Sequence, residues 1–432
     1  MNYLSTNKQS VKTTFREAVL NGQPPDKGLY FPERIPTLPA AFWQNFKWKP
    51  KELIAFETIK PYVGSEIPDE MLLQICLETV NFDFPLVKIT ENISTLELFH
   101  GATLAFKDVG ARFMSRCLQY FSGEKNEKTI VIVATSGDTG GAVANGFYET
   151  ESIEVVILYP QGKVSRVQEL QLTTLGKNIS ALEVKGTFDD CQTLAKTALA
   201  DEELKRKIFL TSANSINVAR WLPQQFYYFY ALQQWQDDEN APVISVPSGN
   251  FGNICAGILA HVSGLPVSKF IAATNANDVI PIYLQSGKMK TKASVQTISN
   301  AMDVGNPSNF VRILEIFDNN FLNLTKKLEA VSVSDERTAR TMREVYERYN
   351  YILDPHGAVG FFALEKYLLE NPGKKGFFLE TAHPVQFDSV ENVIGTYGAI
   401  PAAIEDLFSR PKQSVEMEAN YEDLKKILLE KV

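Results

Sequence analysis

Residues 129–148 read TIVIVATSGDTGGAVANGFY, and this stretch decides the fold class. The run Thr129–Ala134 is apolar and mostly β-branched, which is typical of a buried strand. Small residues follow in a turn, and the stretch from there to Tyr148 suits a helix. A strand, a tight turn and a helix in this order begin a βαβ unit. The stretch therefore predicts a parallel sheet with helices packed on it.

The same alternation of short apolar runs and longer helical stretches continues to Thr274, and it predicts a doubly wound α/β architecture. The predicted strands are Thr129–Ala134, Glu154–Tyr159, Ile179–Lys185, Ile208–Thr211, Pro242–Val246 and Phe270–Thr274. The clearest helices are Asp190–Ala200 and Val218–Trp235, and the aromatic residues of the second are spaced as a core face. After a Ser-, Asn- and Lys-containing stretch, the later predicted elements are helices Asp335–Asn350 and Gly360–Glu370 and strand Gly376–Glu380.

Residues before about 95 differ from the rest of the chain in their sequence pattern. They contain several prolines and two helical stretches, Val11–Asn21 and Asp69–Thr79. This change predicts a separate N-terminal helical unit.

Length and composition narrow the class of protein. At 432 residues the chain is long enough for about two or three hydrophobic cores. With 44% hydrophobic and 22% charged residues, it is typical of a folded globular protein. The net charge is −8 and the basic residues are spread along the sequence, so we expect no nucleic-acid partner. A small anionic substrate stays possible, because it needs only a local pocket of donors.

The cysteines and the N-terminal residues indicate the compartment. The four cysteines are Cys76, Cys117, Cys191 and Cys255. They form no Cys-x-x-Cys pair and have no neighbouring histidine at ligand spacing, so we expect reduced core residues and no metal site. Charged residues between Lys8 and Glu17 interrupt the region where a signal peptide needs an apolar stretch, and no apolar run reaches membrane-spanning length. We expect a cytoplasmic protein with no membrane partner.

The first candidate site is the turn Ala134–Gly141, with sequence ATSGDTGG. Its small residues let backbone N–H groups approach an anion, and the N-terminus of the following helix adds partial positive charge. A carboxylate or a phosphate suits such a site. The alternative is an ordinary tight turn in which Asp138 or Thr139 caps the helix.

A second loop of the same kind is Ser248–Asn253, with sequence SGNFGN, between strand Val243–Val246 and a predicted helix Ile254–Val262. Two such turns at the carboxyl ends of strands in a doubly wound sheet are where ligands usually bind. Neither loop has the Gly-x-Gly-x-x-Gly spacing of a dinucleotide site or the Gly-Lys-Ser/Thr ending of a P-loop. Both nucleotide-binding interpretations are therefore weakened.

A third loop, Ser212–Arg220, follows strand Ile208–Thr211 and reads SANSINVAR. Arg220 lies about one and a half helical turns beyond Asn214, so its guanidinium can return toward the donors at the helix N-terminus. An arginine with amide and hydroxyl donors suits a doubly charged phosphate. The alternative is an ordinary helix cap followed by a surface arginine.

Lys107 is the remaining candidate, in the segment LELFHGATLAFKD at residues 96–108. A lone lysine is usually a solvated surface charge. This one follows an apolar stretch with Gly101 and Phe106 close by, which makes partial burial plausible. Burial lowers the pKa of a lysine and prepares it to form a Schiff base.

Taken together and in this order, these segments resemble the fold-type II pyridoxal-phosphate enzymes, most closely the threonine synthases of bacteria and fungi. Segment 96–108 is similar to the lysine motif of that family, and residues 134–140 are similar to its substrate-carboxylate loop. Further similar segments are KGLYFP at residues 27–32, SGNFG at 248–252, NAMD at 300–303 and TAHP at 381–384. The resemblance thus runs along the whole chain.

The resemblance implies a pyridoxal 5'-phosphate cofactor held by Lys107 as a Schiff base, with the same lysine moving protons between substrate carbons. Thr381 would face the pyridine nitrogen, where a neutral hydroxyl limits how far the ring withdraws electrons. Asp138 stands where many relatives carry Asn near the ring hydroxyl. The residues implied to hold the cofactor phosphate through their backbone are Gly249, Asn250, Phe251, Gly252 and Asn253.

The resemblance also implies the substrate, O-phosphohomoserine, and a lyase reaction. Phosphate would leave by γ-elimination and water would add at the β carbon to give L-threonine. The residues implied to bind the substrate carboxylate are Thr135, Ser136 and Thr139, and those for its phosphate are Asn214, Ser215 and Arg220. Cofactor phosphate, substrate carboxylate and leaving phosphate are three anionic groups, which agrees with the three anion-binding loops.

The implied architecture is that of tryptophan synthase β, with two doubly wound α/β lobes plus the N-terminal unit. The expected ranges are 1–94 for the N-terminal unit and 95–432 for the catalytic region. Within the catalytic region, the smaller lobe covers about 118–215 and the larger one 95–117 and 216–432. A monomer or a homodimer fits equally. The alternatives are a phospho-lyase that releases 2-oxobutyrate and a non-catalytic scaffold of the same fold, although a scaffold has no need for Lys107 and both Gly-rich loops.

Overall fold

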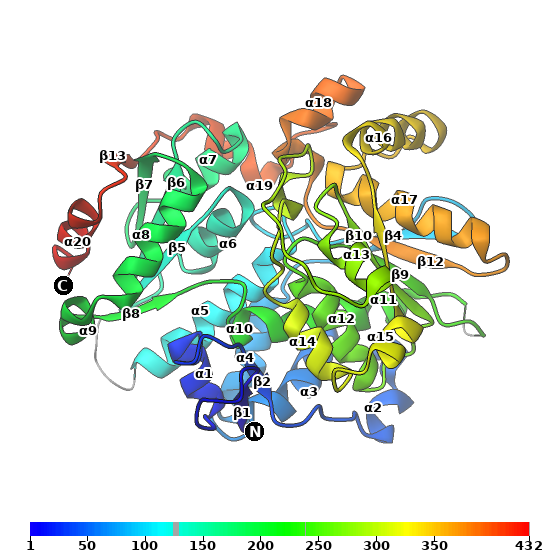
Figure 1. The fold of residues 1–432 in the computed structure, drawn as a ribbon, viewed down its shortest axis with the longest axis horizontal. Helices are drawn as coiled ribbons and strands as arrows, with labels where there is room; N and C mark the ends of the chain where they lie inside the picture. Colours follow the sequence, from blue (N-terminus) through cyan, green and yellow to red (C-terminus); the bar gives the residue numbers. More distant parts are fainter. Residues whose placement is uncertain (124–128, 238, 432) are drawn as a thin grey trace.

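Two helix-covered sheets and an N-terminal unit make up the computed structural model, which describes residues 1–123, 129–237 and 239–431. In Figure 1 the five-stranded sheet lies on the left, the six-stranded sheet on the right and the N-terminal unit below them. One hydrophobic core runs through all three parts, and it includes Phe15, Val131 and Ile244. The predicted α/β fold class is confirmed.

The five-stranded sheet is parallel throughout. Its strands, in spatial order, are β13 (Ser414–Glu418), β7 (Ile179–Lys185), β6 (Ile153–Pro160), β5 (Thr129–Ala134) and β8 (Phe209–Ser212). Its helices are α6 (Asp138–Gly146), α7 (Arg166–Thr173), α8 (Phe188–Ala200), α9 (Glu202–Lys207) and α20 (Tyr421–Leu429). The edge strand β13 corrects the expected lobe ranges. Residues after 413 return to this sheet, because β13 pairs with β7 and α20 packs on α8.

The six-stranded sheet is parallel except for one antiparallel edge strand, β3. Its strands, in spatial order, are β11 (Leu328–Ser332), β10 (Lys269–Thr274), β9 (Val243–Pro247), β12 (Gly376–Glu380), β4 (Ile93–Glu97) and β3 (Leu86–Lys88). Because β3 and β4 belong to this sheet, the boundary expected at residue 94 cuts through it. The larger lobe therefore begins before β3.

Helices cover both faces of the six-stranded sheet and connect the two sheets (Figure 1). Those nearest the site are α5 (Lys107–Gly123), α10 (Val218–Trp221), α11 (Phe226–Gln234), α12 (Gly252–Val262), α14 (Phe310–Ile316) and α17 (Pro355–Glu370). The others are α13 (Val279–Ser286), α15 (Phe321–Lys327), α16 (Asp335–Tyr349), α18 (Asp388–Ile394) and α19 (Ala402–Glu405). Short 3-10 turns are η1 (Phe46–Trp48), η2 (Leu222–Gln225), η3 (Asn300–Met302), η4 (Pro384–Gln386) and η5 (Asp406–Ser409).

The N-terminal unit is helical with a small two-stranded sheet. Its elements are β1 (Tyr3–Ser5), α1 (Phe15–Asn21), β2 (Tyr30–Pro32), α2 (Ala40–Gln44), α3 (Lys51–Val63) and α4 (Asp69–Thr79). It packs directly on β8 and on the segment that follows it. The Asn217 side chain donates to the Val19 carbonyl at 2.8 Å, and the Thr211 hydroxyl donates to the Leu20 carbonyl at 2.9 Å.

Three predicted helices differ from the structure at defined points. The helix expected at Val11–Asn21 begins at Phe15, because Thr14 forms a capping box with Glu17. The helix expected at Val218–Trp235 is tightened into a 3-10 turn around Pro223, which has no backbone N–H to donate. The helix expected from Gly360 begins five residues earlier, where the Asp354 carboxylate caps it.

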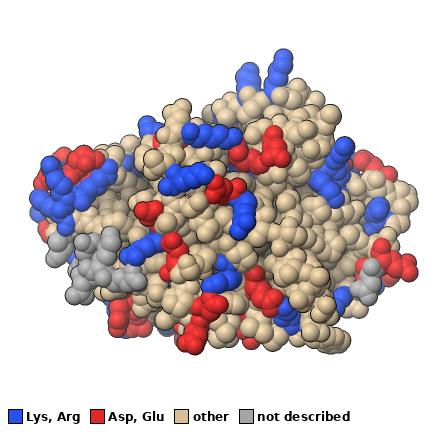
Figure 2. Space-filling view, turned by 90° about the horizontal axis from the view of Figure 1, so that it is seen from below, with Lys and Arg blue, Asp and Glu red and all other residues tan. Residues whose placement is uncertain are grey.

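The surface in Figure 2 carries both acidic and basic side chains. On the face in Figure 2, Lys and Arg side chains are interspersed with Asp and Glu side chains, and no region of one charge stands out. Within the described ranges we find no helix that combines the length and the apolar composition needed to cross a lipid bilayer. All four cysteines are free and buried, as predicted.

Candidate active site

The order of the strands brings the predicted site segments together. In the six-stranded sheet β9, β12 and β4 are parallel neighbours, so their carboxyl ends share one edge. The Gly-rich loop 248–253, Thr381 and the segment leading to Lys107 follow these three strands in that order. In the five-stranded sheet β5 and β8 are neighbours, and the turn 134–141 and the loop 212–220 follow them. Ligands of doubly wound proteins bind at such edges.

Lys107 is the first residue of α5, and its position is fixed by hydrogen bonds to the end of β12. The Phe106 N–H donates to the Thr381 carbonyl at 2.9 Å. On either side, the Leu98 N–H donates to the Glu380 carbonyl at 3.0 Å and the His383 N–H donates to the Leu104 carbonyl at 2.9 Å. Lys107 and Thr381 are therefore held next to each other.

Asp138, at the start of α6, faces Lys107. The Lys107 ammonium donates to an Asp138 carboxylate oxygen at 3.1 Å, and the two side chains are 18% and 6% exposed. Burial by itself raises the pKa of Asp138, but the positive charge of Lys107 and the hydrogen bonds from Lys107 and Gln168 outweigh it. The resulting pKa lies below the ordinary value, so Asp138 is a carboxylate at neutral pH.

Gln168, which the sequence did not single out, orients this carboxylate. Its side-chain amide donates to the second Asp138 oxygen. Gly137 makes room for the contact, because a β-carbon there would overlap the Gln168 amide and its φ of 147° disfavours other residues. The sequence signal, Ser165 followed by Gln168, indicates a capping box and therefore reads only as a helix start.

The loop 248–253 is shaped to receive an anion. A β-carbon on Gly249 would lie 2.7 Å from Met302 Cα and 2.9 Å from the Ala301 carbonyl oxygen, so only glycine fits there. Phe251 adopts a left-handed φ of 61° and caps α12, whose first-turn N–H groups have no intrahelical acceptor. The Asn253 side-chain oxygen accepts hydrogen bonds from the Tyr227 and Tyr228 hydroxyls at 2.8 and 2.7 Å. Helix α11, which carries both tyrosines, thus anchors the first turn of α12.

The loop 212–220 touches the loop 248–253. The Asn250 amide donates to the Ser215 hydroxyl at 3.0 Å, and Asn214 beside it is exposed. Arg220 is buried and donates to the Ala213 carbonyl at 2.7 Å, while its Nε has no partner among the described residues. Burial lowers the pKa of Arg220 to about 10 against the opposing field of Asp108, so the guanidinium stays charged.

In the turn 134–141 the side chains divide into two groups. The Thr135 hydroxyl is turned inward and accepts hydrogen bonds from the N–H groups of Gly137 and Gly140 at 3.0 and 2.9 Å. Its own N–H donates to the Leu158 carbonyl at 2.9 Å. Ser136 is exposed and Thr139 is half-buried, so these two keep donors available for a ligand. Thr135 shapes the turn and offers no free donor of its own.

A buried acid cluster behind Thr381 was also missed by the sequence reading. The Asp354 N–H donates to the Glu380 carboxyl at 2.6 Å, and His356 Nδ1 lies 2.6 Å from an Asp354 oxygen. His356 Nε2 accepts from the Ala301 N–H at 3.2 Å, so the ring carries its hydrogen on Nδ1, which faces Asp354. Burial, followed by the Asp354 charge, raises the pKa of Glu380 far above its usual range. The cluster holds the Ala301 segment against Gly249.

These residues fit pyridoxal phosphate. The loop 248–253 has a cradle that a β-carbon would fill and an N-terminal helix turn with free donors, as a phosphate requires. Lys107 supplies an amine beside it, and Thr381 supplies a neutral side chain at the adjoining strand end. Among the residues that the structure describes, no three His, Cys, Asp or Glu side chains gather in a way that could hold a metal ion.

Comparison with known proteins gives the same picture. The family model for pyridoxal-phosphate dependent enzymes matches residues 93–377, that for the threonine synthase N terminus matches 2–80, and that for its C-terminal part matches 357–428. The threonine synthase of Serratia marcescens is 43% identical over 97% of this chain and 96% of its own length. The chain belongs to the threonine synthase family.

Solved threonine synthases have the same fold. The crystal structure from Escherichia coli is 40% identical, covers 100% of both chains and superposes with a TM-score of 0.92. The yeast threonine synthase structure is 33% identical with the same TM-score, over 100% of this chain and 99% of its own. The predicted fold, the pyridoxal-phosphate cofactor and the enzyme class are thereby confirmed. The roles of the individual site residues stay predictions.

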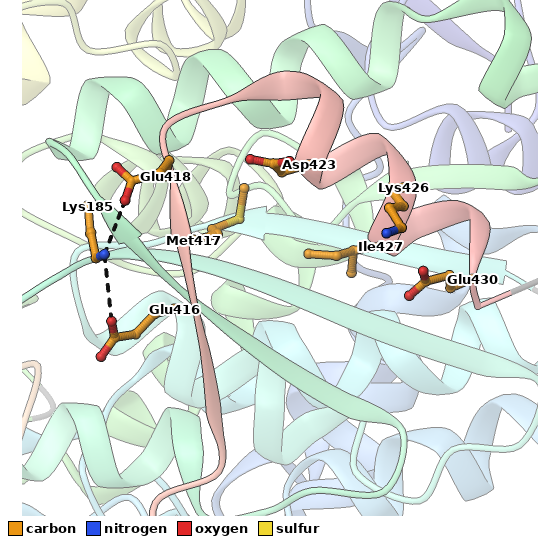
Figure 3. A pocket seen from close by; sticks show the side chains of 8 residues that line it. All are labelled: Lys185, Glu416, Met417, Glu418, Asp423, Lys426, Ile427 and Glu430. Carbon is orange, nitrogen blue, oxygen red and sulfur yellow. Dashed lines mark hydrogen bonds and ion pairs between the residues drawn. The ribbon is translucent and has the colours of Figure 1, made fainter.

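A surface hollow of about 390 Å³ lies away from these loops (Figure 3). It is formed between β13 and α20, with Met417 and Ile427 among its lining residues, and Lys185 pairs there with Glu416 and Glu418. None of the predicted site residues lines it.

Proposed function

We propose that the enzyme converts O-phospho-L-homoserine and water into L-threonine and phosphate. The observation that carries this proposal is that partly buried Lys107 pairs with Asp138 of the turn 134–141, while the loops 212–220 and 248–253 touch through Ser215 and Asn250. These are the three loops proposed to bind anions. The substrate carboxylate, the substrate phosphate and the cofactor phosphate together need three anion-binding sites. Cytoplasmic location and a monomeric or homodimeric state stay predictions.

Lys107 is proposed as the catalytic residue. Bound pyridoxal phosphate supplies the electron-withdrawing ring that makes carbon-bound protons acidic. Lys107 Nζ would hold the cofactor and would move protons at the substrate α and β carbons. Thr381 would offer a neutral hydroxyl to the ring nitrogen, which would keep the electron withdrawal moderate. Asp138, held by Gln168, places a negative charge beside the Lys107 nitrogen.

The substrate is proposed to bind across the two sheets. Ser136, Thr139 and the N-terminus of α6 hold the α-carboxylate, while Thr135 fixes the shape of that turn. Asn214, Ser215 and Arg220 hold the leaving phosphate. The Asn250–Ser215 contact keeps this phosphate beside the cofactor loop, so elimination takes place within reach of Lys107.

The test is a product assay with purified enzyme, O-phosphohomoserine and added cofactor. We expect threonine and phosphate in equal amounts; 2-oxobutyrate in place of threonine would show a phospho-lyase, and no product would leave the scaffold interpretation. Lys107→Ala should lower kcat by at least about 10²-fold, the range of general acid–base catalysis. Exposed Lys290→Ala is the matched control and should not change it.

Arg220 is tested by a separation of kinetic constants. Arg220→Ala should raise KM for O-phosphohomoserine by about 10- to 100-fold, since a hydrogen bond to a charged group contributes about 1.5–3 kcal/mol. Arg220→Lys should recover part of this loss because it keeps the charge. Arg340→Ala, at an exposed position on α16, is the control. An unchanged KM in Arg220→Ala would remove Arg220 from the phosphate site.

A further inference from the structure

Asn309, the residue before α14, carries a buried donor without a partner. Its side chain is fully buried, and its Oδ1 accepts a hydrogen bond from Arg312 Nη1 at 2.8 Å. A guanidinium can only donate, so this contact fixes which end of the amide is oxygen. The Nδ2 group therefore points away from Arg312, and it has no hydrogen-bond partner among the described residues.

The free Nδ2 group lies at the cofactor-phosphate loop. It is 3.3 Å from the position that a β-carbon would take on Gly252, the first residue of α12. The backbone of the same segment is bonded to this loop, because the N–H groups of Asn309 and Ser308 donate to the Asn250 backbone and side-chain oxygens at 3.2 and 2.6 Å. The unpaired Asn309 Nδ2 group therefore lies beside Gly252, at the N-terminus of α12, where the backbone N–H groups are also free to bind an anion.

Arg312 does not bind the anion itself, because each of its nitrogens has a partner. Nε and Nη2 donate to the Tyr30 carbonyl at 3.1 and 2.8 Å, and Nη2 also donates to the Ile216 carbonyl at 2.6 Å. The guanidinium lies 4.3 Å over the Trp221 ring. It therefore joins β2 of the N-terminal unit to the loop 212–220 and to the amide of Asn309.

We propose that Asn309 is a further cofactor-binding residue, whose Nδ2 group donates to the phosphate of pyridoxal phosphate. Arg312 is its positioning residue, and through Tyr30 the N-terminal unit helps to set the phosphate site. The proposal rests on the assignment of loop 248–253 to the cofactor phosphate. It accounts for a buried donor that would otherwise stay unpaired, which is costly in a folded protein.

The experiment compares the affinity of apoenzyme variants for pyridoxal phosphate and for pyridoxal, which lacks the phosphate. Asn309→Ala should weaken pyridoxal phosphate about 10- to 100-fold, the loss of one hydrogen bond to a charged group. Asn309→Asp should weaken it further, because it keeps the side-chain volume and the contact with Arg312 but opposes the phosphate with a negative charge. The affinity for pyridoxal should change by less than about twofold in both variants, since the ring and Lys107 are untouched.

Two further variants complete the test. Asn178→Ala removes amide hydrogen bonds to the Phe147 and Ile153 carbonyls far from the loop, and it should bind both probes like wild type. Arg312→Lys should weaken pyridoxal phosphate and not pyridoxal. Equal losses of affinity for pyridoxal phosphate and pyridoxal in Asn309→Asp would mean that Asn309 is purely structural. Unchanged affinities for both, with a raised KM for O-phosphohomoserine, would assign its amide to the substrate phosphate. Either result overturns the proposal. The wild-type product assay is independent of these affinities, so it tests the proposed function separately.

Discussion

Gly249→Ala is the substitution that tests the cofactor loop most directly. The new β-carbon would lie 2.7 Å from Met302 Cα and 2.9 Å from the Ala301 oxygen, both backbone atoms, and real β-carbons essentially never approach within 3.0 Å. Neither atom can rotate away, so the two segments must separate. Overpacking of this kind costs about 1–3 kcal/mol. If the strain falls on the bound state, the affinity for pyridoxal phosphate decreases about 5- to 150-fold.

The assay is a titration of apoenzyme with pyridoxal phosphate, followed by visible absorbance. Gly252→Ala is the graded comparison, since its β-carbon would meet one side-chain amide, that of Asn309, at 3.3 Å and no backbone atom. Gly123→Ala is the control, because nothing lies within 4 Å of its β-carbon position. We expect the loss of affinity to rise from Gly123→Ala through Gly252→Ala to Gly249→Ala.

Two results would refute this reasoning. Wild-type affinity in Gly249→Ala would mean that the loop does not grip the cofactor in the geometry described. A larger loss in Gly252→Ala than in Gly249→Ala would mean that the Ala301–Met302 contact is not what shapes the site. Urea unfolding of each apoenzyme separates a loss of binding from a loss of folding.

The remaining predictions concern the charged groups around Lys107. In wild type, the lowered pKa of Asp138 stabilises the folded apoenzyme above the carboxyl pKa of the unfolded chain, and this stabilisation is lost as pH falls through the pKa of the folded state. In Asp138→Asn the free energy of unfolding should therefore depend less on pH in the acid range. Urea unfolding between pH 3 and 7 measures this. The raised pKa of Glu380 means that wild type loses stability as pH rises above 4.5, where the unfolded chain releases this proton more readily than the folded one. Glu380→Gln carries no such proton, so it should gain stability relative to wild type over this range. The same urea unfolding series measures the difference. Gly357→Ala should lower the free energy of unfolding by about 3 kcal/mol, because its β-carbon would overlap the Glu380 carboxyl group, and Glu380→Ala should restore part of it in the double variant.

Local patterns predicted much of the fold. Strands β5, β7 and β12 have the bounds that short apolar runs indicated, and α4 begins and ends at the predicted residues. The three loops could be proposed as anion sites because a small-residue turn between a strand and a helix is also a local signal. The sequence reading did not predict strands β1, β2, β3, β4, β11 and β13. All of them except β4 lie at a sheet edge, where a short strand has little apolar pattern to distinguish it from a loop.

The residues that support the site were not predictable in the same way. Gln168 reads as a helix cap, Arg312 as an ordinary helical arginine and Glu380 as the last residue of a strand. Each acquires its role from a partner far away in the sequence. Arg312 is the clearest case, because its partner Tyr30 lies 282 residues away.

The sequence by itself determined the strand and helix units, the lysine and the three loops, because these depend on side-chain periodicity and turn chemistry over a few residues. Only the tertiary structure decided that β9, β12 and β4 are neighbours and that β5 lies beside β8. That order follows from the packing of the whole core, in which each strand takes the neighbours that bury its apolar faces. It is this order that brings Lys107, Thr381 and the anion-binding loops together, and that aims the Asn309 amide at the cofactor loop.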